Sequence, residues 1–167
     1  MKTFIVVFVV LSLLGSVMWM MPTPREKFLA KLRLKAKAEG FHVQLVRLTA
    51  PRAQGEMEEQ NMNITAYRLP RDNTNKKLTG NLQPWQIFRL QAIANEGLPE
   101  NWCWKQGERV LNEKQLSTLH KVIAMLPKEV VALESTPVTV TAYWKEQSEE
   151  QLAVIKEALN ELLKENV

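Results

Sequence analysis

The first apolar run along the chain is also its longest. Phe4 to Met21 contains no charged residue and is interrupted only by Ser12, Gly15 and Ser16. A helix over these 18 residues would be about 27 Å long, close to the roughly 30 Å hydrocarbon core of a bilayer. The run therefore predicts a transmembrane anchor over residues 1–21.

A cleaved signal peptide is the alternative interpretation of this segment. Lys2 supplies a positive start, but cleavage requires small residues three and one positions before the cut. Val17 to Met21 is bulky, and cleavage after Ser16 would place Leu14 at the upstream position. The anchor is the favoured interpretation for this reason.

A basic helix with one apolar side is predicted over residues 22–40. Thr23, Pro24 and Glu26 have the pattern of an N-cap, a first helical residue and a capping box, and Gly40 marks the end. The apolar positions that share one side are Phe28, Leu29, Leu32 and Ala36. Such a helix either lies on anionic lipid headgroups or packs its apolar side on the following domain.

Short alternating segments and two amphipathic helices fill residues 41–167. Alternation of apolar and polar residues predicts strands over 41–49, 62–69, 85–90, 102–105, 130–133 and 138–144. A polar loop is expected over 70–84, and capping sequences at Asn112 with Gln115 and at Ser148 with Gln151 begin the helices. The order α-ββββ-α-ββ-α predicts an α+β domain with a mixed or antiparallel sheet and its helices on one side.

The positive charge is concentrated beside the apolar run. Residues 22–40 contain six Lys or Arg and two Glu, whereas residues 41–167 contain 15 basic and 16 acidic side chains. The nearly neutral domain does not predict nucleic-acid binding. Because Lys2 is the one basic side chain before the run, the positive-inside rule predicts a single-pass protein of the cell inner membrane with a cytoplasmic domain.

Residue types that catalyse reactions or bind metals are sparse in this sequence. Cys103, His42 and His120 are its only thiol and imidazoles, and no motif spacing links them. A single free cysteine is usually inert packing, and the glycines form no phosphate-binding loop. We therefore expect no metal and no cofactor, and the sequence favours a non-enzymatic protein over an enzyme.

Tryptophan is the residue type that stands out in the domain. Trp85, Trp102, Trp104 and Trp144 fall in predicted strands, and the two-residue period places Trp102 and Trp104 on one face. One interpretation is a large aromatic core. The other is a partner-binding surface, because tryptophan is enriched at interface hot spots. That surface would consist of Trp85, Arg89, Trp102, Trp104 and Arg109.

Pro22, Pro24, Arg25 and Lys27 follow the apolar run in a pattern that resembles the start of bacterial inner-membrane proteins of the preprotein translocase subunit YajC family. The chain is more similar to longer, uncharacterised proteobacterial proteins that often carry the same label. Those proteins are expected to share the pattern Leu126-Pro127, Ala142-Tyr143-Trp144 and Leu159. YajC itself has a smaller, glycine-bearing β domain that residues 41–167 do not match. A translocon accessory role is therefore implied only by the family label that these proteins carry.

Together these features predict a membrane-tethered accessory or scaffold protein that binds another membrane-associated protein. One alternative is a membrane-anchored enzyme of unrecognised type, which would show a deep polar pocket containing groups of shifted pKa. The other is a protein that senses anionic lipids in the bilayer. The candidate membrane-surface residues are Arg25, Lys27, Lys31, Arg33, Lys35 and Lys37.

Overall fold

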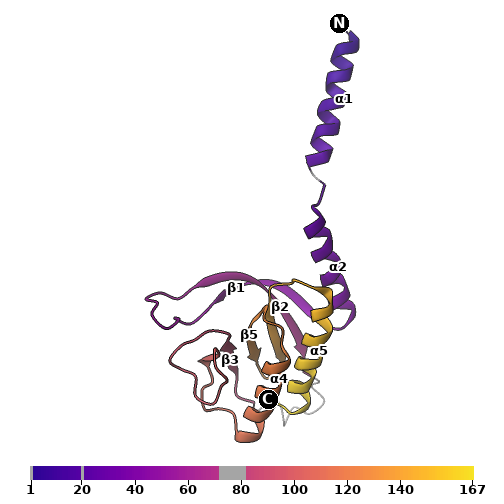
Figure 1. Ribbon diagram of the computed structural model, residues 1–167. Coiled ribbons are helices and arrows are strands. Elements are labelled where there is room, and N and C mark those ends of the chain that lie inside the picture. The colour runs from indigo at the N-terminus through magenta and orange to yellow at the C-terminus, as the bar shows by residue number, and fades with distance from the viewer. Residues whose placement is uncertain (1, 20, 72–81) are drawn as a thin grey trace. The chain divides into compact units, whose positions relative to one another are not determined.

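The computed structural model describes residues 2–19, 21–71 and 82–167 (Figure 1). The chain divides into two compact units, residues 1–34 and residues 35–167. The boundary between the two units falls inside helix α2 (Pro24–Ala38). Most of the loop predicted over 70–84 lies outside the described residues.

The predicted membrane anchor over residues 1–21 is wrong. The first helix, α1 (Lys2–Trp19), begins at a lysine, and its uncharged part from Phe4 to Trp19 is roughly 24 Å long, shorter than a hydrocarbon core of about 30 Å. Among the residues described, no helix is long and apolar enough to cross a membrane. The expected single-pass topology, and the inner-membrane location with a cytoplasmic domain, are therefore wrong as well.

Helix α2 begins where its capping sequence predicts. The Thr23 hydroxyl accepts a hydrogen bond from the Glu26 amide at 3.3 Å, and the Glu26 carboxylate accepts one from the Thr23 amide at 2.6 Å. This reciprocal capping box satisfies two amides that lack partners within the helix. Gly40 follows the helix with a φ of 95°, a left-handed conformation that glycine adopts without strain.

Six antiparallel strands form one sheet in residues 35–167, so the prediction of an α+β domain holds for this unit. The strand order across the sheet is β1-β2-β6-β5-β3-β4. Every strand begins within one residue of its predicted position. The strands are β1 (His42–Thr49), β2 (Asn61–Pro70), β3 (Trp85–Phe88), β4 (Cys103–Gln106), β5 (Val130–Ser135) and β6 (Thr139–Trp144).

Two helices, α4 (Glu113–Met125) and α5 (Glu149–Lys164), pack against each other (Figure 1). Helix α5 also packs against β6. The predicted capping box of Asn112 and Gln115 is present at the start of α4. Ser148 caps α5 as predicted, but the side-chain Oε1 of Gln151 accepts a hydrogen bond from Trp144 Nε1 at 3.0 Å instead of closing the capping box. This contact joins α5 to the last sheet strand.

Aromatic side chains form the centre of the core between the sheet and α5. The Trp144 and Tyr67 rings meet edge to face with centroids 5.2 Å apart, and Tyr67 meets Phe41 in the same way at 5.7 Å. All three side chains are buried. Edge-to-face pairs contribute about 1 kcal/mol each beyond the burial of their apolar area. The row connects β6 to β2 and to the residue that precedes β1.

A smaller apolar cluster covers the other side of the sheet. Its buried members are Leu48, Ala50, Ile64, Ala66, Phe88, Cys103, Ala132 and Tyr143. Leu90 and Ala92, from the connection between β3 and β4, pack against this cluster. The Gln54 amide donates to the Gln91 carbonyl at 2.9 Å, which joins the β1–β2 loop to the same connection.

Gly107 provides a direct test of the packing around Trp85. Its φ is 83°, and a Cβ added there would lie 2.5 Å from Trp85 Cβ and 2.8 Å from Trp85 Cα. Gly107→Ala should therefore destabilise the protein by about 3 kcal/mol or more, since backbone strain and a clash with a buried strand act together. Gly55→Ala is the matched control, because its φ is 90° and nothing lies within 4 Å. It should cost only about 1 kcal/mol. Equal free energies of unfolding by urea titration for the two variants would contradict this packing.

Candidate functional site

The three tryptophans of the predicted partner-binding surface lie in the interior. Trp85, Trp102 and Trp104 are 1%, 3% and 3% exposed. The Trp85 and Trp104 rings pack edge to face at 6.3 Å, and Trp104 Nε1 donates to the Glu96 carbonyl at 2.9 Å. A partner protein would meet almost none of their surface, so the indoles act in the core.

The two arginines of that surface have different surroundings. Arg89 Nε donates to the Val130 carbonyl at 3.0 Å and its Nη2 to the Pro127 carbonyl at 3.1 Å. Its guanidinium also lies 4.8 Å from the centre of the Trp102 ring. Arg89 therefore fixes the connection that follows α4. Arg109 is exposed and pairs with Glu96 at 2.6 Å.

The predicted membrane-surface cations all lie on α2, which is where the sequence places them. Lys35 forms an ion pair with Glu149 of α5 at 2.8 Å, and this contact raises the pKa of its amine. The Arg25 guanidinium lies 5.3 Å from the centre of the Phe28 ring. Lys37 lines a groove at the start of β1. The anionic lipid partner stays a prediction that these contacts leave untested.

Cys103, His42 and His120 do not come together. Cys103 lies on β4 and His42 on β1, at opposite edges of the sheet. His120 is on α4, where its Nε2 is 2.7 Å from the Gly97 carbonyl oxygen. Cys103 is fully buried in the smaller apolar cluster, and burial raises the pKa of its thiol. The arrangement keeps the thiol protonated and away from a base.

Two buried charged side chains hold strands in place. The Glu146 carboxylate accepts hydrogen bonds from the hydroxyls of Thr65 and Tyr67, each at 2.8 Å. Arg71 Nη2 donates to Ser135 Oγ and to the Val167 carbonyl oxygen, both at 2.6 Å. These contacts tie β2 to segments distant in sequence. Across the described ranges, no group of three or more His, Cys, Asp or Glu side chains could hold a metal ion.

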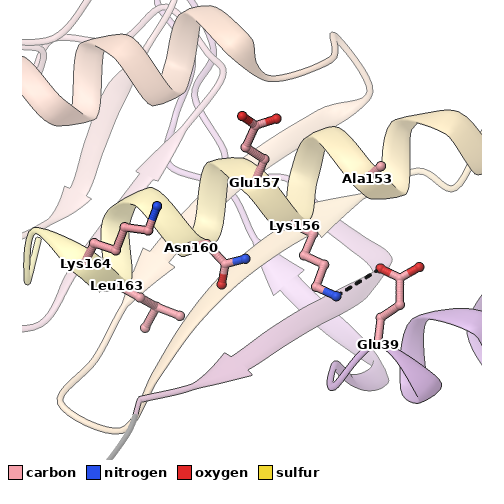
Figure 2. A pocket seen from close by; sticks show the side chains of 7 residues that line it. All are labelled: Glu39, Ala153, Lys156, Glu157, Asn160, Leu163 and Lys164. Atoms are coloured by element: carbon pink, nitrogen blue, oxygen red, sulfur yellow. Dashed lines mark ion pairs between the residues drawn. The ribbon is translucent and has the colours of Figure 1, made fainter.

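An open groove of about 430 Å³ follows the outer side of α5. Figure 2 shows Lys156 extending from the helix toward Glu39, with which it pairs at 3.4 Å. Leu163 and Ala153 provide apolar lining beside Asn160. The carboxylate and the amine satisfy each other, so this groove presents no cluster of like charge or converging donors to select a ligand.

A feature that the sequence analysis missed is the outer edge of β1. The register pairs His42 through Thr49 with β2 without a shift, and among the described strands none lies on the other side of β1. The Ala50 amide donates to the Gln60 carbonyl at 2.8 Å, in the same register. Because antiparallel strands alternate the direction of their main-chain groups, even-numbered residues of β1 face β2. The amides and carbonyls of Val43, Leu45, Arg47 and Thr49 therefore face outward.

The opposite edge of the sheet is covered. β4 is only four residues long, and its register with β3 shifts between Gln86 and Ile87. The Trp104 amide donates to the Ala94 carbonyl at 2.7 Å, so the β3–β4 connection occupies this edge. At β1 the comparable contact comes from Lys105 Nζ, which donates to the Thr49 carbonyl at the far end of the strand. Within the described ranges, no strand or main-chain hydrogen bond covers the outward side of residues 43–47 of β1.

The core position of Trp104 can be separated from a surface role by paired substitutions. Trp104→Ala should destabilise the protein by about 3–5 kcal/mol, because a large buried side chain is removed. Arg109→Ala breaks an exposed ion pair and should cost less than about 1 kcal/mol. Both values follow from urea unfolding curves. A Trp104→Ala protein with an unchanged midpoint would contradict the core position.

The Cys103 thiol should be protected from modification. Because the side chain is buried and its pKa is raised, a thiol reagent at neutral pH should react at least about a hundredfold more slowly with the folded protein than with the denatured protein. The rates can be measured from absorbance with a chromogenic disulfide. A folded-state rate equal to that of denatured protein would show that the cluster opens freely.

The chain matches no protein-family model, and no curated protein or solved structure matches it at a significant level. The resemblance to YajC remains a prediction carried by four residues near the start.

Proposed function

We propose that residues 35–167 form a protein-binding module, which takes an extended segment of a partner protein on the outer edge of β1. The observation that carries this proposal is the accessible edge itself. Strand addition supplies main-chain hydrogen bonds that do not depend on partner sequence, and side-chain contacts then add selectivity. The role is that of an accessory or scaffold protein, as the sequence suggests.

The absence of edge protection on β1 supports this role. Natural sheets commonly block their edges with proline, lysine, bulges or very short strands. β1 has eight residues, no proline or lysine and no shift in register. Arg47 is the one residue of the types Lys, Arg, Asp and Glu in β1. The Leu45 side chain is 64% exposed. An edge of this length and composition pairs readily with another strand.

The geometry of the edge also limits what can bind. Val43, Leu45 and Arg47 each present one amide and one carbonyl outward, so an incoming strand can form a short ladder of hydrogen bonds. Each such bond contributes about 1 kcal/mol in net terms. The hydrogen-bond ladder alone therefore predicts weak affinity. Contacts with the partner's side chains must supply the remaining binding free energy.

Proline at position 45 tests strand addition without disturbing the sheet. The Leu45 amide faces outward, so Leu45→Pro removes a donor from the edge but no bond to β2. Leu45→Ala is the matched control, because it removes the side chain and keeps the amide. Octapeptides selected from a random display library on the wild-type chain should bind Leu45→Ala, and should bind Leu45→Pro about tenfold more weakly or worse.

The folding of the proline variant is checked by its melting temperature, which should stay within a few degrees of wild type. If Leu45→Pro unfolds, Arg47→Pro replaces it, because the Arg47 amide faces outward too. Val46→Pro should be destabilised in either case, because its amide faces β2. Selected peptides that bind the folded proline variant as tightly as wild type would overturn strand addition.

A further inference from the structure

We propose that the segment taken by β1 is acidic, with its carboxylates beside the first half of the strand. This inference rests on the proposed function, because it names the partner chemistry of the same edge. The domain as a whole is nearly neutral, so the net charge gives no indication of this preference. The preference for an acidic segment follows from the positions of the individual charged side chains around β1.

β1 and its neighbour β2 carry cations and no acidic side chain of their own, although Arg68 also lies beside Tyr143, whose hydroxyl donates to Glu134 of β5. The sequences of β1 and β2 contain Arg47 and Arg68 but no Asp or Glu. Arg68 is opposite His42 in the register, and its Nη1 donates to Gln44 Oε1 at 2.6 Å, so the guanidinium is held beside the first half of β1. An acidic partner would lower the electrostatic energy of this region, and a basic one would raise it.

A groove opens at the same end of the strand. Its volume is about 530 Å³, and its lining is Lys37, Phe41, His42, Val43, Gln44 and Arg68. Lys37 and Arg68 place two cations in it, and the Phe41 and Val43 side chains add apolar surface. A Glu side chain opposite Val43 on an added strand would project from the face of the sheet that carries Val43 and Arg47, where it would meet Lys37, whereas Arg68 projects from the other face beside Gln44. The groove therefore supplies the side-chain contact that the short ladder requires.

The far end of β1 has a different character. The β1–β2 loop contains Glu56, Glu58 and Glu59, and the Glu56 carboxylate accepts a hydrogen bond from Gln60. Lys105 Nζ already donates a hydrogen bond to the outward Thr49 carbonyl. Carboxylates of the partner are therefore favoured beside residues 42–47 and not beside the loop. If the added strand is antiparallel, like every pair in this sheet, the acidic residues lie in its C-terminal half.

Three fluorescein-labelled octapeptides with the sequence Thr-Val-Thr-Val-X-Val-X-Val, where X is Glu, Gln or Lys, test the inference on the full chain. Fluorescence anisotropy should give the order Glu, Gln, Lys from tightest to weakest, with about a tenfold difference between Glu and Lys. The Lys37→Gln/Arg47→Gln double variant should reduce affinity for the Glu peptide by about threefold to tenfold and leave the Gln peptide unchanged. Lys121→Gln, an exposed lysine on α4, is the matched control and should change neither.

The outcomes separate the inference from the proposed function. Equal binding of all three peptides, abolished by Leu45→Pro, would overturn the acidic preference while strand addition stands. Tightest binding of the Lys peptide would overturn it too. Glu-peptide binding that Leu45→Pro leaves intact would place the acidic site elsewhere and contradict both proposals. No binding of any peptide at millimolar concentration would also contradict both.

Discussion

The position of β1 depends on contacts from its inner side, apart from the hydrogen bond of Lys105 with Thr49 at the far end of the strand. The aromatic row from Trp144 through Tyr67 to Phe41 connects the core to the residue before β1, and β2 pairs with the whole length of the strand. Trp144 is tied in turn to α5 through Gln151. The strand is therefore held by its inner side, and no described residue pairs with the outward main-chain groups of residues 43–47. Because β1 is already ordered before a partner binds, little further conformational entropy is lost when a partner strand adds to it.

Local patterns were sufficient to predict most of the elements. Alternation located the six strands, and the capping sequences at Thr23 and Asn112 began α2 and α4 where expected, because these contacts lie within four residues of each other. The same reasoning failed for Gln151, whose side chain binds Trp144 instead of the helix start. The position of the Gln151 side chain depends on a contact with β6, and the residues around the helix start give no indication of that contact.

Two larger errors have related causes. The uncharged run from Phe4 to Met21 predicts a membrane span, whereas the helix runs from Lys2 to Trp19. The two-residue period places Trp102 and Trp104 on one face of the sheet, but it does not tell whether that face is buried in the core or exposed to a partner. The sequence pattern therefore could not distinguish a core from a binding surface. The outer edge of β1 was missed because strand order depends on which distant segments pair. The sequence signal that points to it is the lack of acidic residues between positions 41 and 55.

The central claim is that the outward amides of β1 are free and accept a partner strand, and amide hydrogen exchange measures this most directly. In the free chain, the amides of Leu45 and Arg47 should exchange rapidly, whereas those of Val46 and Leu48 should be protected by β2. Addition of the Glu-containing peptide should slow exchange at Leu45 and Arg47 and leave Val46 nearly unchanged. Protection of the Leu45 amide in the free chain, or its continued rapid exchange when the peptide is bound, would contradict the account.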